Sequence, residues 1–592
     1  MTPRLCWPLA LPCCVALSLL APSPSAEACG GTFCDNTAIP MPVDQTGEDI
    51  LFVREGSEVE VHIRIAYVGE AERFSWVVPL QAIPEVTVGS EALFGALSQA
   101  STPAWITSRT YECPEEDPNW GAEDGGEFTG DTGDPMFDLG GPDVVFEATV
   151  GAYEVVVLQG GTAAEVIDFL TANDYAQDPE AEPILQEYLD EGFLFAAVKL
   201  TSGVGIENIH PLVFRMQADE FCVPIRLTRI AASEDMGIRA YFLGSERWAP
   251  SNYDHVVLNP LRYDWKSSLG YPDYLELLAL ALDEAEGGRG FVTDFAGPSA
   301  DVQTFGLWSA AWDETAFIGS DPIDAIALIA EQGLNVHPLI QTLLMQYIPP
   351  PDGLDPQDFW NNIGSYADLI DLAAWDDVEF AAMIGERIIE PGLHATDLLE
   401  AWPYLTRLHT VLSPPEMTVD PTFHANPDLP EVARARVTAT QVLCGGDEVH
   451  QVDVAGTAQA VCVPAGTTWP SFDMPAALRI EQVPMAGPPQ VLVDNEVEIV
   501  ATLAEQQQGT LCSSAGGGES TGSDGSGDTG TSETTNATAS GGDEAEATTS
   551  GPTYDLPYDT TCGCASERGE APLAIALGLL VLGLARPRRR VG

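Results

Sequence analysis

Residue patterns that could carry catalysis are scarce in this chain of 592 residues. There is no H-E-x-x-H motif and no Walker phosphate-binding loop. The eight histidines are scattered, and none follows another at the three- or four-residue spacing that places two imidazoles on one face of a helix. The motifs G-x-S-x-G and G-x-G-x-x-G occur once each, at 518–522 and 525–530, where no strand precedes them. The sequence therefore predicts no catalytic residue.

Three aspartates could bind a metal ion. Asp131, Asp134 and Asp138 lie in an acidic, glycine-rich insert at 114–143. This composition is typical of calcium-binding loops, because Ca²⁺ prefers clustered oxygen ligands. The order of ligands does not follow the EF-hand, and a surface loop without a metal explains the same residues. We expect no cofactor, and calcium at these aspartates is the alternative.

Cysteines predict disulfide chemistry in an oxidising compartment. Seven of them lie between residues 29 and 512, and they show no C-x-x-C pair and no zinc-type spacing with histidine. Cys29 with Cys34 and Cys444 with Cys462 are the nearest neighbours along the chain, so we expect these two local bridges. An odd number leaves at least one thiol outside any pair within this stretch.

The end of the chain carries a tripartite tail. Cys562 and Cys564 precede an apolar run at 571–585, which Arg586, Arg588, Arg589 and Arg590 follow. As a helix this run of about 15 residues is roughly 22 Å long. A permanent membrane span usually needs about 20 apolar residues, so the run is short for one. The arginines stay on the cytoplasmic side. The tail therefore predicts a membrane-arrested precursor, and an uncut membrane anchor is the alternative.

The beginning of the chain predicts export. Arg4, an apolar run at 7–20 and the small residues up to Ala28 are typical of a secretory signal peptide at 1–28. Processing as a lipoprotein at Cys29 is the alternative, although Glu27 fits that pattern poorly.

Net charge excludes one class of partner. The formal charge is −66, so the surface repels phosphate backbones and nucleic-acid binding is not expected.

Residues 509–561 are rich in Gly, Ser, Thr and acids, and 513–561 hold nine acids and no base. Such a segment cannot bury a core, which predicts a disordered acidic stalk between the ectodomain and the tail.

The pattern of apolar residues predicts an α+β ectodomain, whose strands and helices must position any site. Residues 29–250 alternate as strands do, for example at 58–67 and 153–158, with helices at 90–99 and 162–173. A further strand is expected at 223–230, helical periodicity dominates 251–430, and strands return at 431–508, the last of them at 490–503. We expect a strand-rich N-terminal unit, a helical middle, a small C-terminal β part, the stalk and a C-terminal hydrophobic helix.

Two family resemblances follow from these residues. The Cys-Gly-Cys, apolar helix and arginine cluster of 562–592 resemble the MYXO-CTERM sorting signal of myxobacteria and their relatives. That resemblance implies cleavage near Cys562 or Cys564 by a membrane-embedded sorting protease, after delivery by the export machinery. The ectodomain resembles the domain of unknown function 2330 family of exported bacterial proteins. This second resemblance implies export and domain extent but no activity. It rests on seven segments: Ala28–Cys34, Phe74–Leu80, Val150–Leu158, Phe195–Thr201, Pro224–Thr228, Phe291–Gly297 and Leu405–Met417.

The sequence thus predicts an exported protein that reaches the cell surface or outer membrane after C-terminal processing, from a precursor in the inner membrane. Its expected role is non-catalytic, in envelope structure, adhesion or recognition. The alternative is a secreted hydrolase that uses paired carboxylates on envelope or prey polymers, since such a pair must converge in space and can be distant in sequence.

Replacing both Cys562 and Cys564 by Ala should strand the precursor in the inner membrane, because the processing site is lost. The mature wild-type protein should lack 571–592. Intact-mass analysis of protein from the native host checks this, and recovery of the arginine-rich C-terminus would contradict it.

Overall fold

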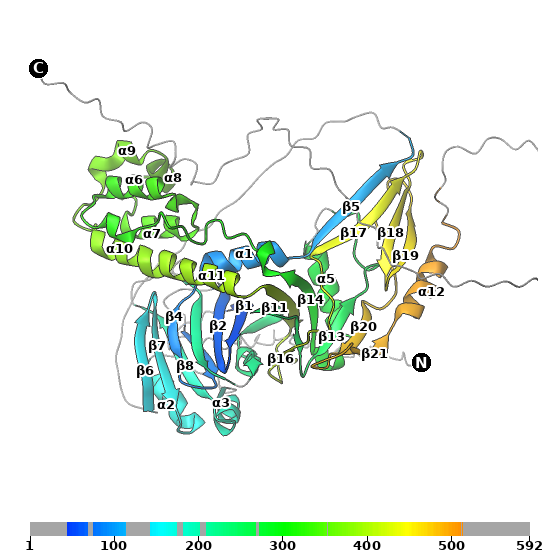
Figure 1. Cartoon of the computed structure of the whole chain (residues 1–592), viewed down its shortest axis with the longest axis horizontal. Helices are drawn as coiled ribbons and strands as arrows, with labels where there is room; N and C mark the ends of the chain where they lie inside the picture. Colours follow the sequence, from blue (N-terminus) through cyan, green and yellow to red (C-terminus); the bar gives the residue numbers. More distant parts are fainter. Residues whose placement is uncertain are drawn as a thin grey trace, which may run out of the picture.

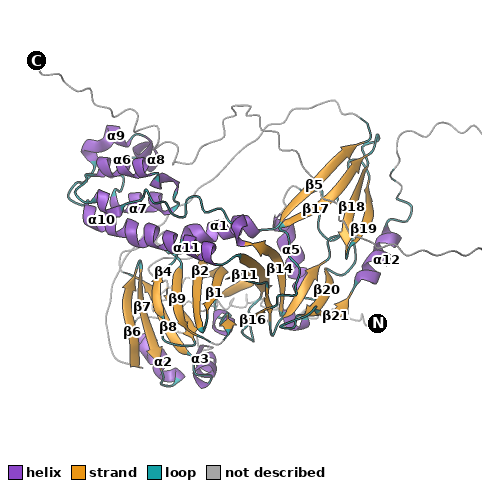
Figure 2. Ribbon diagram, in the orientation of Figure 1, coloured by secondary structure: helices purple, strands orange, loops and turns teal. Residues whose placement is uncertain are grey.

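The computed structural model describes residues 44–68, 75–113, 143–173, 181–201, 209–218, 220–267, 271–351, 353–510 and 512 (Figures 1 and 2). Several predicted features lie outside these residues: the signal peptide, Cys29, Cys34, Asp131, Asp134, Asp138, the stalk at 513–561, and the tail with its cysteines and arginines. Within the described residues, no helix combines the length and apolarity that a membrane span needs.

A ten-stranded sheet forms the centre of the molecule and draws strands from most of the chain. Its order is β21 (Gln490–Asp494), β20 (Ala477–Gln482), β13 (Asp254–Leu258), β14 (Gly290–Pro298), β15 (Tyr404–Leu412), β11 (Ala232–Gly244), β1 (Asp44–Glu55), β2 (Glu58–Val68), β9 (Leu212–Gln217) and β4 (Glu85–Val88). Most neighbours are antiparallel, but β1 with β11 and β13 with β14 are parallel.

One face of the central sheet packs against a second sheet. This sheet consists of β3 (Ser75–Leu80), β8 (Leu194–Leu200), β7 (Tyr153–Gln159) and β6 (Asp143–Val150), and the two inner faces share an apolar core. Helices α2 (Ala163–Ala172) and α3 (Ala181–Asp190) cover its outer face (Figure 1). The predicted start of α2 is confirmed, because Thr162 and Glu165 form a reciprocal capping box.

Helices α1 (Glu91–Ser101) and α11 (Glu390–Ala401) lie over the opposite face of the central sheet (Figure 2). A helical unit with its own core is inserted between β14 and β15 and leads into α11. Its helices are α6 (Pro322–Gln332), α7 (Leu339–Tyr347), α8 (Pro356–Asn361), α9 (Ile363–Tyr366) and α10 (Asp377–Ile384), and a π-helical turn at Gly385–Ile389 joins α10 to α11.

A third sheet stands beside the central one. It pairs β5 (Ala104–Tyr111) in parallel with β17 (Ala435–Val442), followed by β18 (Glu448–Val454) and β19 (Thr457–Val463). Helices α5 (Tyr271–Leu282) and α12 (Glu496–Gln506) share a core with this sheet. A small sheet of β10 (Phe221–Cys222), β16 (Thr422–Ala425) and β12 (Trp248–Pro250) completes the strands.

The α+β class is confirmed, while two element predictions are wrong. A strand predicted at 223–230 contains instead the short helix α4 (Ile225–Thr228), which begins after Pro224. A strand predicted at 490–503 ends at Asp494, and α12 occupies the remainder because its apolar residues repeat with helical period and bury Ile499 and Leu503.

Two disulfides stabilise the third sheet, and the predicted Cys444–Cys462 bridge is wrong. Cys113 pairs with Cys444 at the shared end of β5 and β17, with their Cα atoms 5.1 Å apart. Cys462 pairs with Cys512 and ties β19 to the segment after α12. The β18–β19 register places Cys462 opposite Val449, so the hairpin does not close on Cys444. Cys222 is the free cysteine of the described region.

Peptide mapping of the non-reduced protein should recover the Cys113–Cys444 and Cys462–Cys512 links. Removing the first by changing both cysteines to Ser should lower the free energy of unfolding by about 2–5 kcal/mol, because that bridge closes a very long loop. Recovery of a Cys444–Cys462 peptide would refute the pairing.

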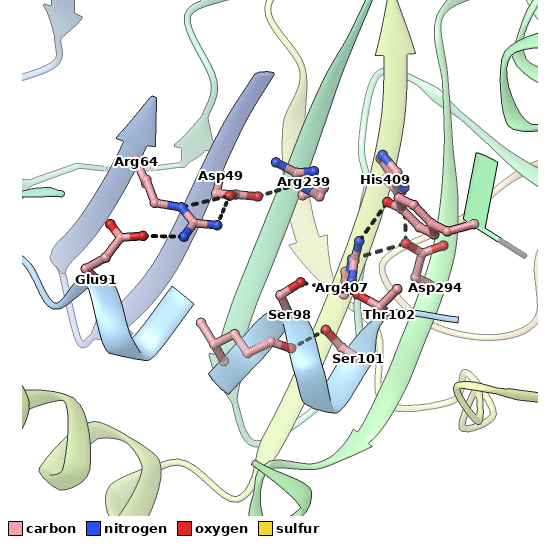
Figure 3. Close-up of polar contacts among 12 residues, drawn as sticks. Asp49, Arg64, Glu91, Ser98, Ser101, Thr102, Arg239, Asp294, Arg407 and His409 are labelled. Atoms are coloured by element: carbon pink, nitrogen blue, oxygen red, sulfur yellow. Dashed lines mark hydrogen bonds and ion pairs between the residues drawn. The ribbon is translucent and has the colours of Figure 1, made fainter. Parts of the chain in front are cut away.

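A row of charged side chains crosses the face of the central sheet under α1 (Figure 3). Arg64, Asp49, Arg239 and His409 are direct cross-strand neighbours on β2, β1, β11 and β15. Arg64 donates to Asp49 at 3.0 Å and to Glu91 at 2.6 Å, and Arg239 also donates to Asp49. Buried charges are tolerated when they are paired in this way.

Asp294 on β14 ends this row and is fully buried. Its carboxylate accepts hydrogen bonds from Tyr274 and from His409 at 3.2 Å, and Arg407 lies 3.1 Å away as an ion pair. Burial acts to raise the pKa of Asp294, but Arg407 and His409 outweigh burial and hold that pKa below its ordinary value. Arg407 also donates to Thr102 at the end of α1, at 2.6 Å.

Asp294→Asn should destabilise the protein by about 3–5 kcal/mol, because Arg407 is left as an unpaired buried cation. Urea unfolding measures the change. Asp473→Asn, at an exposed aspartate, is the matched control and should be neutral. A loss no larger than that of the control would contradict the role assigned to Asp294.

Candidate functional site

A cavity of about 730 Å³ opens where the central sheet splits. Strands β13 and β14 pair only at Asp254 with Gly290 and His255 with Phe291. Further along, the edge of β14 is taken by Val432, which exchanges two hydrogen bonds with Ala296 at 2.8 and 2.9 Å. The two strands therefore diverge, and residues from β13, β14, β17 and β20 line the space between them.

Aromatic and aliphatic side chains form one wall of the cavity. Trp105 of β5 stacks on Tyr263 with ring centroids 4.4 Å apart, and Tyr274 of α5 lies 5.3 Å from the same indole. Leu277 and Leu429 add aliphatic surface. A wall of this kind favours the flat, apolar body of a small ligand.

A hydroxyl, an imidazole and a carboxylate converge in the cavity. The Thr293 hydroxyl lies 3.0 Å from Nε2 of His255, whose Nδ1 lies 3.3 Å from the Glu481 carboxylate. Because a carboxylate only accepts, Nδ1–H of His255 donates to Glu481 and Nε2 accepts from Thr293. All three side chains are almost completely buried.

Arg247 completes the polar group. Its Nη2 donates to the Thr293 hydroxyl at 2.9 Å and its Nη1 to the Pro430 carbonyl at 2.7 Å. Its Nε is buried and has no hydrogen-bond partner within the described residues. The guanidinium is thus held in the lining of the cavity by two hydrogen bonds, and its positive charge can attract an anionic acceptor.

Burial sets the charge state of these groups. Desolvation lowers the pKa of His255 below its ordinary value, so the imidazole is neutral at neutral pH. Burial acts to raise the pKa of Glu481, but the hydrogen bond from His255 and the charges of Arg479 and Arg247 together outweigh burial and hold that pKa below its ordinary value, so the carboxylate stays ionised. Arg479 lies 3.4 Å from the other oxygen of Glu481. Arg247 also acts on this carboxylate, because its charge together with that of Arg479 lowers the pKa of Glu481.

This arrangement has two chemical capacities. The guanidinium and the hydroxyl can hold an anionic or hydrogen-bonding head group at the polar end of an apolar cavity. The chain from Glu481 through His255 to Thr293 can also draw a proton from a hydroxyl, as in acyl-transfer enzymes. Thr293 already accepts a hydrogen bond from Arg247, which favours the first capacity in the resting protein.

Sequence reasoning missed this site. Cys444 and Cys462, the predicted site residues that the structure describes, form disulfides and do not line the cavity. His255, Thr293 and Glu481 are separated by as many as 226 positions, so no local spacing relates them. One signal was present: the consecutive polar pair Thr293 and Asp294 interrupts the apolar segment Phe291–Gly297.

Comparisons with known proteins add the family. No curated protein matches the chain. One solved structure is similar, that of a mutated baculovirus P35 after caspase cleavage, with 11% identity over 37% of this chain and 80% of that chain. Its TM-score of 0.20 is too low to support an argument about fold. The family described as "Uncharacterized protein conserved in bacteria (DUF2330)" matches residues 23–423, well over half of the chain. The protein therefore belongs to the DUF2330 family.

Proposed function

We propose that the protein is exported, anchored at the cell surface, and binds a small amphipathic anion in the cavity between β13 and β14. Export and anchoring are supported by the apolar N-terminal run and by the Cys-Gly-Cys, short apolar run and arginine cluster at the C-terminus. Its role is non-catalytic recognition, and it binds its ligand at the cell envelope.

One observation carries the ligand class. The buried guanidinium of Arg247 lines the same cavity as the stacked rings of Trp105 and Tyr263. The cavity volume lies within the roughly 300–1,000 Å³ of small-molecule sites. An aromatic or lipid-like body with a carboxylate, sulfonate or phosphate head matches both ends. The strongly negative surface does not oppose this, because a single buried cation acts at short range.

Two dyes of nearly the same shape test the ligand class. 1-Anilinonaphthalene-8-sulfonate carries a sulfonate, and N-phenyl-1-naphthylamine is its neutral counterpart. We expect the wild-type protein to bind the sulfonate at a single site. Arg247→Leu should weaken that binding by about 10–100-fold through loss of a charge-assisted hydrogen bond, while the neutral dye should bind as well or better. Fluorescence titration measures both.

Arg109→Leu is the matched control, since Arg109 is exposed on β5 outside the cavity, and it should leave both affinities unchanged. Equal loss of both dyes in Arg247→Leu would indicate a collapsed cavity. Retention of sulfonate binding by a folded Arg247→Leu protein would refute the proposal.

Hydrolysis is the second candidate function. The alignment of Thr293, His255 and Glu481 favours a mechanism with a hydroxyl nucleophile over one with paired carboxylates. Turnover of p-nitrophenyl butyrate that is lost in Thr293→Val and retained in Thr293→Ser would assign the hydroxyl a catalytic role. Turnover that survives Thr293→Val would exclude that role.

A further inference from the structure

A second polar cluster joins β2 of the central sheet to α11, toward the β4 edge of the sheet, whereas the cavity lies toward the β21 edge. Glu60 and His62 lie on β2, and His394 lies on α11, more than 330 positions later. Nε2 of His62 is 2.6 Å and Nε2 of His394 is 2.5 Å from the same oxygen, Oε1 of Glu60. The two rings are parallel within 6°, with centroids 5.9 Å apart.

We propose that Glu60, His62 and His394 bind a divalent transition-metal ion of the zinc type. Two imidazoles and one carboxylate are a ligand set of catalytic zinc centres. The three ligand atoms all lie within 4.8 Å of one another. Ligands about 2.0–2.2 Å from zinc at tetrahedral angles are roughly 3.4 Å apart, so the ion needs only a small outward movement of the side chains.

The surroundings hold these side chains in a ligating arrangement. Nε of Arg215 donates to Oε2 of Glu60 at 3.1 Å, which orients the carboxylate and leaves Oε1 for the ion. Nδ1 of His62 is buried and has no hydrogen-bond partner within the described residues. Metal binding at Nε2 places the ring proton on Nδ1, so the free energy of metal binding must offset an unpaired buried donor there.

The site has one open side. The side chain of His394 is 37% exposed, whereas those of Glu60 and His62 are 8% and 2% exposed. His394 lines a cleft of about 720 Å³ together with Glu314, Glu386 and Glu390. Three protein ligands leave a coordination position for water or substrate, as in catalytic rather than structural zinc sites.

The cleft indicates what could approach the ion. Glu390 is one helical turn before His394 on α11, and Glu386 lies in the π-helical turn that leads into this helix. Such turns are frequent at functional sites. The carboxylates disfavour phosphate esters and favour a neutral or cationic substrate. This site is independent of the anion-binding cavity, since the two share no residue.

A structural ion-pair hub is the competing explanation, because Arg215 and two histidines could simply neutralise Glu60. The two explanations differ in metal uptake. We expect the purified protein, stripped with chelator and titrated with Co²⁺, to bind one ion per chain. The visible spectrum should show four- or five-coordinate cobalt, and two paramagnetically shifted imidazole N–H signals should appear by proton NMR. Zn²⁺ should displace the cobalt.

His394→Ala should lower the affinity at least about 100-fold, and Arg215→Gln about 10-fold, in line with the loss of a ligand and of an orienting contact. Glu314→Gln removes a carboxylate that lines the same cleft, and it should leave the affinity unchanged. Near-ultraviolet circular dichroism checks that each variant is folded.

The result for the wild-type protein decides the matter even if a variant does not fold. A folded wild-type protein that takes up no stoichiometric Co²⁺ or Zn²⁺ would establish the ion-pair hub and overturn the metal site. Uptake that shows no shifted imidazole signals, or that a folded His394→Ala protein retains in full, would place the ion among the cleft carboxylates and also overturn it.

Discussion

The buried carboxylate of Asp294 is the constraint on which the rest of the structure depends. It lies at the middle of the central sheet, where a lone charge would be prohibitively costly, and it is held by Arg407, His409 and Tyr274. These partners come from β15 and α5, and Arg407 extends the network to Thr102 at the end of α1. The Asp294 carbonyl also accepts from Arg436 of β17 at 3.0 Å. One residue thus fixes how the central sheet, two helices and the third sheet meet.

Both candidate sites follow from this arrangement. Thr293 precedes Asp294 on β14, so the network that fixes Asp294 also fixes the strand that places the Thr293 hydroxyl beside His255. At the other end of the charged row, Arg64 and Glu91 join β2 to α1. The same strand presents Glu60 and His62 to α11. The helical unit inserted between β14 and β15 ends in α11, so this insertion delivers His394 to the sheet.

Local secondary structure was predictable from the sequence, whereas contacts between distant segments were not. The α+β class follows from side-chain periodicity, and the start of α2 follows from the Thr162 cap. The parallel pairing of β5 with β17 joins segments more than 300 residues apart and explains why Cys444 bonds to Cys113. Large separations along the sequence also explain why the candidate sites were not predicted. His62 and His394 show no helical spacing, because one lies on a strand and the other on a helix. Polar residues within buried strands were the one signal in the sequence that pointed to these sites. Their partners could be identified only once the fold was known.

Binding of an amphipathic anion beside Arg247 is the central claim, and a crystal structure of the protein purified from its native host tests it most directly. We expect a bound molecule between β13 and β14, with its apolar part against Trp105 and Tyr263 and an acidic group within hydrogen-bonding distance of Arg247. A cavity filled by protein side chains, or a bound molecule whose acidic group lies away from Arg247, would contradict it.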